Sequence, residues 1–314
     1  MAQAVPSQQE VRAPASRPRA DPVALLLVRA LRPRQWTKNA AVLAPLVFAH
    51  KALEPASAGR ALGATAAFCL LSSAVYVFND LADRARDREH PLKRLRPIAS
   101  GALGTGAAVA LGAAALTVAL GSFWLLGRAA FFAAAGYLGL QVAYTALLKR
   151  LVIVDVLSIA LGFVVRVASG ALAIAVPISN WLYLCAFLLA LFLGFSKRRA
   201  ELTLLQDSAG AHRQSLADLS LPLLDQLISV VTAATIVSYA LYTMSEETLR
   251  KFGTDALKFT IPCVVYGIFR YLYLIYRRGE GESPEKILLS DVPLLVDIVV
   301  FMGIVGAVLY WPRS

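Results

Sequence analysis

The chain has 314 residues, of which 58% are hydrophobic, and its mean hydropathy is +0.63. Repeated apolar stretches of roughly 17 to 25 residues match the length that a helix needs to cross a bilayer, which excludes an ordinary soluble protein. The formal charge of +11 is concentrated in the loops beside these stretches. It therefore needs no nucleic-acid partner to explain it.

These features predict an all-α, polytopic membrane protein with about nine transmembrane helices around a central cavity that opens to the cytoplasm. Residues 1–22 are rich in Ala, Pro, Arg and Gln and too poor in apolar side chains to fold. We expect them to form a disordered basic tail before one membrane domain over 23–314. The predicted spans are 40–56, 61–80, 103–122, 128–147, 152–174, 180–196, 224–243, 257–276 and 292–311.

Lys and Arg are divided unevenly between the two ends of these spans. The amino-terminal segment and the loops on its side carry 22 of them, whereas the loops of the other side carry seven. Because short loops rich in Lys and Arg stay in the cytoplasm, we expect the amino terminus to be cytoplasmic.

The segment RPRQWTKN, residues 32–39, precedes the first span and combines Arg34 and Lys38 with Trp36. These residue types are typical of a positively charged anchor at the membrane interface. The alternative is that Arg34 or Lys38 binds a substrate phosphate.

The most informative segment is NDLADRARDREHPLKRLRPIASG, residues 79–101. If the second span continues as a helix, Asn79, Asp83 and Asp87 lie at i, i+4 and i+8, and Asp80 falls in the same sector. Three carboxylates would then converge. Mg²⁺ takes oxygen ligands and draws several of them from water and substrate phosphates, so the pattern favours a magnesium-diphosphate site.

Cations follow these acids directly. Lys93, Arg94 and Arg96 are candidates for holding the phosphates themselves. The alternative is a salt-bridged helix end without a metal, in which the acids are neutralised by Arg84, Arg86 and Arg88.

The segment YTALLKRLVIVD leads into the fifth span and contains Tyr144, Lys149 and Asp155. An acid inside an apolar helix is costly unless it is paired or faces water. Asp155 shares one stripe of this helix with Arg166, and we expect the stripe to face the protein interior; it also carries Gly162 and Gly170. A structural Asp–Arg arrangement and direct substrate binding both fit this pattern.

The segment SKRRAEL, residues 196–202, follows the sixth span. Lys197 and Arg198 serve either as orientation signals or as phosphate ligands. Glu201 lies four residues after Lys197 and is placed to orient its ammonium group.

Together these motifs resemble the UbiA superfamily of intramembrane prenyltransferases, whose first aspartate-rich motif, NxxxDxxxD, is matched by Asn79, Asp83 and Asp87. RPRQWTKN, HPLKRLRPIASG, YTALLKRLVIVD and SKRRAEL more narrowly resemble the branch that transfers phosphoribosyl to decaprenyl phosphate. The resemblance spans residues 30–311.

The resemblance implies an Mg²⁺-dependent transferase of a bacterial inner membrane. It would move 5-phosphoribosyl from 5-phosphoribosyl diphosphate to a polyprenyl phosphate, for lipid-linked pentose donors of the cell envelope. A homo-oligomer is left open. The implied catalytic acids are Asp80, Asp83 and Asp87, which with Asn79 are also the metal ligands. The implied phosphate-binding residues are Lys38, Lys93, Arg94, Arg96, Tyr144, Lys149, Arg166, Lys197 and Arg198, supported by Arg34, Asp155 and Glu201.

One departure from the family pattern bears on the substrate. Typical members that prenylate aromatic rings carry a second aspartate-rich motif after the sixth span, where SKRRAEL has three cations and one acid. This exchange favours binding of further phosphate groups over a second metal cluster. The alternatives are prenyl transfer from a prenyl diphosphate to an aromatic acceptor and, in another class, a lipid-binding or transport protein.

Overall fold

The structure is a computed structural model that describes residues 22–91, 93–177, 179–206, 219–279, 281 and 284–310. Within these ranges the regular structure is entirely helical, which confirms the predicted fold class. The tail predicted for residues 1–22 lies outside the described residues except for Pro22.

Eight helical segments in the described part of the chain are long and apolar enough to cross a membrane. They are α3 (Pro55–Ala82), α5 (Thr105–Leu126), α6 (Arg128–Ala146), α7 (Val154–Ala173), α8 (Asn180–Gln206), α9 (Leu221–Met244), η5 with α11 (Ala256–Thr260 and Ile261–Arg278) and α13 (Val292–Tyr310). The shorter elements are α1 (Val23–Leu31), η1 (Pro33–Leu43), α2 (Ala44–Phe48), α4 (Arg84–Glu89), η2 (Lys93–Leu95), η3 (Leu148–Arg150), α10 (Glu246–Phe252) and α12 (Pro284–Ser290).

The first predicted span, 40–56, does not form one long helix. The 3₁₀ helix η1 runs to Leu43, and the five-residue α2 follows with Pro45 in its first turn, where a missing backbone N–H is tolerated. Asn39 of η1 is buried, and its amide donates to Ser72 Oγ of α3 at 3.1 Å. Polar contacts with α3 therefore hold this segment in place, and the length of its apolar run wrongly predicted a single transmembrane helix.

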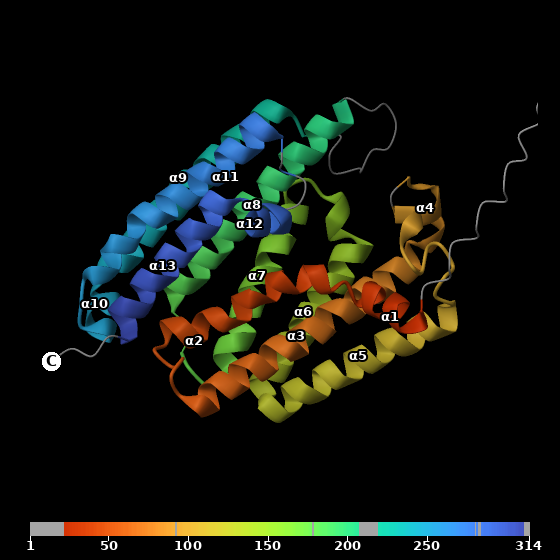
Figure 1. The fold of residues 1–314 in the computed structure, drawn as a ribbon, viewed down its shortest axis with the longest axis horizontal. Helices are drawn as coiled ribbons and strands as arrows, with labels where there is room; N and C mark the ends of the chain where they lie inside the picture. The colour runs from red at the N-terminus through yellow and green to blue at the C-terminus, as the bar shows by residue number, and fades with distance from the viewer. Residues whose placement is uncertain are drawn as a thin grey trace, which may run out of the picture.

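The spans pack mainly against their neighbours in the chain, α3 against α5, α6 against α7, α7 against α8 and α8 against α9. In Figure 1, α9, α11 and α13 lie on one side, α3 and α5 on the other, and α7 between them. The hydroxyl of Tyr310, at the end of α13, donates to the carbonyl oxygen of Val47 at 3.1 Å and accepts from the N–H of Ala52 at 3.2 Å. The last helix is thereby tied to the segment around α2.

Two apolar cores lie on either side of α7. Phe68 and Phe123 pack edge to face in the core between α3, α5 and α6. Phe192 belongs to the other core, between α8, α9 and α11. Because Val156 of α7 belongs to one core and Ala173 to the other, α7 joins the two halves of the bundle.

Gly170 permits η1 to lie directly against α7. A Cβ atom built on Gly170 would lie 2.0 Å from the carbonyl oxygen of Val42, which is closer than any two non-bonded atoms can pack. The neighbour is backbone and cannot rotate away. Gly170 is therefore needed for this helix contact.

We expect Gly170→Ala to lower the free energy of unfolding by about 3 kcal/mol, because the added methyl group must push η1 away from α7. Thermal unfolding in detergent, followed by circular dichroism, measures this loss. Gly136→Ala is the matched control, since a Cβ there meets nothing within 4 Å and alanine favours a helix. Equal melting temperatures for both variants would show that η1 does not depend on this contact.

Candidate active site

The acidic motif lies where α3 is interrupted. α3 ends at Ala82, Asp83 has non-helical backbone angles (φ −90°, ψ 5°), and α4 begins at Arg84. The N–H of Asp87 still donates to the carbonyl oxygen of Asp83 at 2.8 Å. The uninterrupted helix predicted for 79–87 is therefore wrong at Asp83, a residue type whose side chain competes with helical hydrogen bonds.

Two of the acids converge on one arginine. Asp80 and Asp87 are 5% and 4% exposed, and Nη1 of Arg96 lies 3.0 Å from Asp80 Oδ1 and 2.6 Å from Asp87 Oδ2. Nη2 of Arg32 contacts the same Oδ1 of Asp80 at 2.5 Å. We call these four residues the aspartate–arginine cluster. Arg32 belongs to the RPRQWTKN segment, and its position there did not predict this contact with Asp80.

The other two residues of the acidic motif have separate partners. Asp83 pairs with the exposed Arg86 at 3.5 Å, and Asn79 Oδ1 accepts from Thr145 Oγ1 of α6 at 3.1 Å. Among the described residues, no group of three His, Cys, Asp or Glu side chains is placed to hold a metal ion. Two carboxylates thus converge here, in place of the three expected from a continuous helix.

Arg84 and Arg88 of α4 contact the chain that follows the acidic motif. Nη1 of Arg84 donates to Thr105 Oγ1 at 2.8 Å, and Nε of Arg88 donates to the carbonyl oxygen of Ala99 at 3.0 Å. Of the three arginines of α4, only Arg86 forms an ion pair with an acid of the motif within the described chain. Lys93 and Arg94 lie exposed on this loop.

The RPRQWTKN segment is built into the protein along α3. Nε1 of Trp36 donates to Ser73 Oγ at 3.0 Å, and that hydroxyl donates to the carbonyl oxygen of Leu31 at 2.7 Å. The ammonium group of Lys38 donates to Gln35 Oε1 at 2.5 Å, whereas Arg34 is exposed. The tryptophan therefore does more than mark the interface, because it holds the start of η1 on α3.

Arg166 is enclosed between α7, η1 and α6. It donates to Asn39 Oδ1 at 3.0 Å, to the carbonyl oxygen of Gly162 at 3.0 Å and to the hydroxyl of Tyr137 at 2.8 Å. The rings of Tyr137, Phe68 and Phe163 lie 4.9 to 5.3 Å from its guanidinium carbon. Its partners in the described chain are neutral, and they point to a role in positioning η1.

The predicted stripe of α7 does face the interior, since its four members are buried: Asp155, Gly162, Arg166 and Gly170. The partner of Asp155, however, is Arg198 of α8, whose Nε lies 2.8 Å from Asp155 Oδ2. Both of these side chains are almost fully buried.

The three cations of the SKRRAEL segment have different partners. Arg198 also contacts Glu201 Oε2 at 2.5 Å, and the half-exposed Lys197 lies 3.9 Å from Glu201 Oε1. Arg199 turns to α9, where its Nε lies 2.6 Å from Asp225 Oδ1. Lys197 is the cation of this segment that remains accessible, while Arg198 connects α8 to α7.

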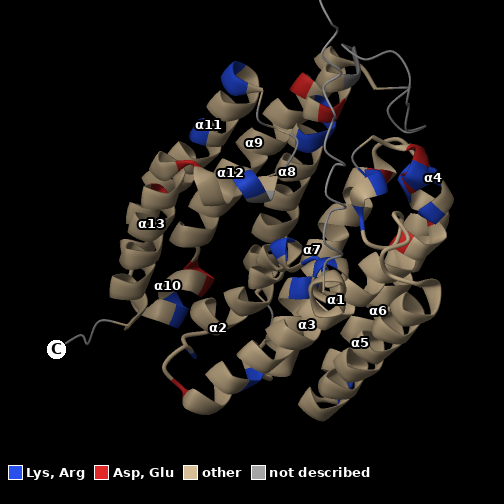
Figure 2. Cartoon of the chain, turned by 45° about the vertical axis from the view of Figure 1, so that its right-hand side comes forward, with Lys and Arg blue, Asp and Glu red and all other residues tan. Residues whose placement is uncertain are grey.

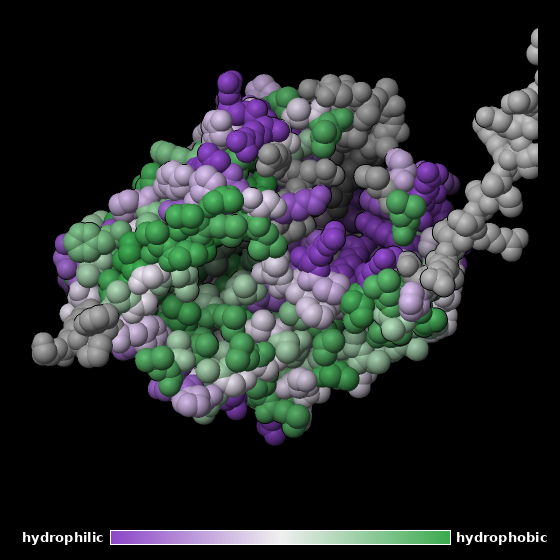
Figure 3. All heavy atoms as spheres, viewed as in Figure 1, coloured by the Kyte–Doolittle hydropathy of each residue, from purple (hydrophilic) through white to green (hydrophobic). Residues whose placement is uncertain are grey.

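Several of the predicted residues lie near one end of the bundle, whereas Arg166 is buried well inside α7. Tyr144 lies near enough to Arg198 for electrostatic interaction, and Lys149 is half-buried in η3. Figure 2 shows charged residues around α4 and at the upper end of α8. Figure 3 shows hydrophilic surface lining a recess between these two regions. The two buried carboxylates, Asp80 of α3 and Asp87 of α4, belong to one of these regions, and Lys197 of α8 belongs to the other.

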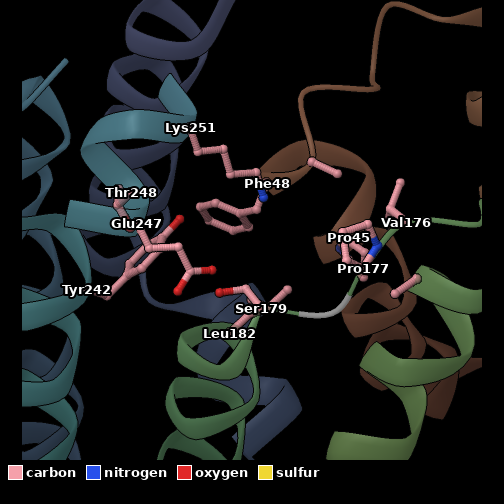
Figure 4. Close-up of a pocket in the computed structure, with 12 residues that line it drawn as sticks. Pro45, Phe48, Val176, Pro177, Ser179, Leu182, Tyr242, Glu247, Thr248 and Lys251 are labelled. Atoms are coloured by element: carbon pink, nitrogen blue, oxygen red, sulfur yellow. The ribbon is translucent and has the colours of Figure 1, made fainter. Parts of the chain in front are cut away.

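A second recess lies at the other end of α7 and is lined by Phe48, Ser179, Tyr242, Glu247 and Lys251. Figure 4 shows the carboxylate of Glu247 pointing toward Ser179. The space inside is about 20 Å³, which is enough for a single water molecule. It is too small for a substrate. A larger space of about 480 Å³ between α9 and α11 is lined mainly by apolar side chains and offers no charged group for a phosphate among the described residues. The charged recess is therefore the candidate active site.

Comparisons with known proteins identify the family of the chain. The UbiA prenyltransferase family matches residues 40–289. A decaprenyl-phosphate phosphoribosyltransferase from Mycolicibacterium smegmatis is 33% identical over 296 residues, which cover 91% of this chain and 92% of the relative. The protein of the same name from Mycobacterium tuberculosis is 31% identical and covers 90% of this chain and 93% of the relative.

Solved structures show the same fold. A UbiA homolog from Archaeoglobus fulgidus, bound to GPP and Mg²⁺, superposes with a TM-score of 0.69 at 20% identity and covers 90% of this chain and 99% of that chain. The same protein bound to DMAPP and Mg²⁺ gives a TM-score of 0.67, covering 91% of this chain and 99% of that chain. The family match, the curated relatives and the shared fold lead to one conclusion: this chain belongs to the UbiA prenyltransferase family.

Proposed function

We propose that this protein transfers a 5-phosphoribosyl group from 5-phosphoribosyl diphosphate to decaprenyl phosphate. The main support for the proposal is that relatives named decaprenyl-phosphate phosphoribosyltransferase match nine-tenths of the chain at 31–33% identity. The charged recess supports it, because both substrates are polyanions and the recess presents cations from two sides. The bond from the anomeric carbon to diphosphate breaks, a bond from that carbon to a lipid phosphate oxygen forms, and diphosphate leaves.

The side chains of the acidic motif are of the types that bind a magnesium ion. Asp80 and Asp87 present carboxylate oxygens to one shared cation position, and Mg²⁺ usually binds through one or two carboxylates while phosphates and water supply the remaining ligands. Asn79 and Asp83 add oxygen donors nearby. When bound, Mg²⁺ would neutralise the charge that develops on the leaving diphosphate.

The protein's own groups account for the other requirements. Lys93 and Arg94 are exposed beside the paired acids and would bind phosphate oxygens. Lys197 would bind a phosphate from the α8 side. The acceptor phosphate is already anionic near neutral pH, so it needs positioning and no general base.

The ion pairs of SKRRAEL argue against a second metal cluster. Glu201, its one acid, already contacts Arg198 and lies near Lys197. A prenyl transferase for aromatic acceptors would need a second acidic set at this place, which the segment does not supply. We also propose that the recess faces the cytoplasm of a bacterial cell, because it lies on the side with 22 of the loop cations.

The direct test uses purified protein in detergent with Mg²⁺, decaprenyl phosphate and 5-phosphoribosyl diphosphate labelled in the sugar. Label should enter the lipid extract only when both the metal and the lipid are present. A parallel reaction contains a prenyl diphosphate and an aromatic acid. Prenylated product in that reaction, without label in the lipid of the first, would assign the chain to aromatic prenylation.

Asp87→Asn should lower the rate of phosphoribosyl transfer by at least about 100-fold, because it removes one of the two buried charges that would hold the metal. Initial rates over a magnesium titration measure the effect. Asp255→Asn is a control that removes an exposed acid paired with Lys258, outside the recess. A near-parental rate for Asp87→Asn at saturating Mg²⁺ would remove Asp87 from the metal site.

Arg198→Ala and Lys197→Ala should separate structure from substrate binding. Loss of Arg198 leaves the buried Asp155 without its cation, so we expect a stability loss of about 3–5 kcal/mol. Lys197→Ala should leave the melting temperature unchanged and raise the KM of a phosphate substrate about tenfold. Unchanged kinetic constants for both substrates would make Lys197 an orientation signal only.

A further inference from the structure

The aspartate–arginine cluster contains its own cation at the position between the two acids. Arg96 Nη1 lies 3.0 Å from Asp80 Oδ1 and 2.6 Å from Asp87 Oδ2. A single nitrogen therefore bridges two buried carboxylates. A metal ion that used the same two oxygens would occupy the same space, so the metal and the Arg96 side chain exclude each other there.

The cluster is electrically balanced as it stands. Two carboxylates face two guanidinium groups, those of Arg32 and Arg96. A bare divalent ion would have to displace Arg96, and the two carboxylates, Arg32 and the ion would then carry one excess positive charge in a buried setting, while Arg96 would lose its two acidic partners. Both changes are unfavourable. A metal that arrives with diphosphate brings its own negative charge. Its phosphate oxygens are also good acceptors for a displaced guanidinium.

The surroundings of Arg96 allow its side chain to move while its backbone stays. Ile98 and Ala99, just after it, are buried, and the carbonyl oxygen of Ala99 is held by Arg88 at 3.0 Å. The Arg96 side chain itself is 31% exposed. A change of side-chain conformation is thus sufficient to free the two carboxylates and to point the guanidinium at a ligand in the recess.

We propose that Arg96 is a resident counter-cation that makes metal binding and diphosphate binding depend on each other. This inference rests on the proposed function, because it takes the diphosphate as the ligand of the recess. In the empty protein Arg96 neutralises Asp80 and Asp87 and excludes the bare metal. With metal and diphosphate bound, Arg96 would contact the phosphate oxygens in place of the two carboxylates.

Two binding measurements on the full chain in detergent test this coupling without any turnover. Binding of bare Mn²⁺ is followed by electron paramagnetic resonance, and binding of ³²P-labelled inorganic diphosphate is followed by equilibrium dialysis with Mg²⁺ or with EDTA. The parent protein should bind bare Mn²⁺ weakly, and Mg²⁺ should tighten its diphosphate binding by about 30-fold or more, within the usual range of coupled ligands.

Arg96→Gln should bind bare Mn²⁺ about tenfold more tightly than the parent, because the competing cation is gone. Its diphosphate binding should be weaker, and Mg²⁺ should tighten it less than in the parent, since the two couplings are reciprocal. Arg94→Gln is the matched control for the Mn²⁺ measurement alone, because it removes the same charge from the same loop but belongs to the proposed phosphate-binding residues. The ion pairs of Asp80 and Asp87 in the described chain do not include Arg94, so its affinity for bare Mn²⁺ should match that of the parent.

The outcomes separate this inference from the proposed function. Equal or weaker binding of bare Mn²⁺ by Arg96→Gln, compared with the parent and Arg94→Gln, would overturn the role of Arg96. Failure of the parent to bind diphosphate in a metal-dependent way would instead overturn the proposed metal site. If Arg96→Gln does not fold, Arg96→Met carries the test, because methionine also removes the competing charge and keeps an unbranched side chain. Its affinity for bare Mn²⁺ should exceed that of the parent, and an equal affinity would contradict the proposal.

Discussion

Burying a charge inside a membrane protein is costly unless an opposite charge or several hydrogen-bonding groups accompany it. This constraint decides where the polar residues of the bundle lie. Asp155 and Arg198 meet between α7 and α8 with both side chains almost fully buried. Asp80 and Asp87 meet the guanidinium of Arg96 at the end of α3. The first pair joins two helices, whereas the second set lies beside the recess with a partner that remains partly exposed.

The buried charge of Arg166 is stabilised without an acidic partner in the described chain. Three neutral oxygens accept its hydrogen bonds, and three aromatic rings surround its guanidinium. One of those oxygens belongs to Asn39, whose amide nitrogen donates to Ser72 of α3. Arg166 and Asn39 therefore hold η1 between α7 and α3. The close packing of Gly170 against Val42 fixes the same segment from a second position.

The sequence predicted the fold well because bilayer thickness sets the length of apolar runs, a property that needs no tertiary contact. The prediction of one transmembrane helix over 40–56 was wrong, because the buried polar contacts of Asn39 and the proline of α2 determine the structure there. The sequence also predicted that three acids would converge, because a uniform helix was assumed through Asp83. A single non-helical residue there separates the partners of Asp83 from those of Asp80 and Asp87.

Ion pairs between distant parts of the chain could not be predicted from the sequence, for a different reason. Asp155 shares its helix with Arg166, yet its partner is 43 residues away at Arg198, and periodicity within one helix carries no information about a neighbouring helix. Arg270 lies 21 residues from its partner Asp291, to which it donates two hydrogen bonds at 3.0 and 2.8 Å, and these bonds lower the pKa of that carboxyl group. A sequence shows which residues are charged and could bind a substrate. Whether such a residue stabilises helix packing or binds a substrate depends on the side chain with which it pairs in the fold. In this bundle Arg198 is committed to a buried acid, and Arg96, with a partly exposed side chain between two acids, is the arginine whose partner a ligand can replace.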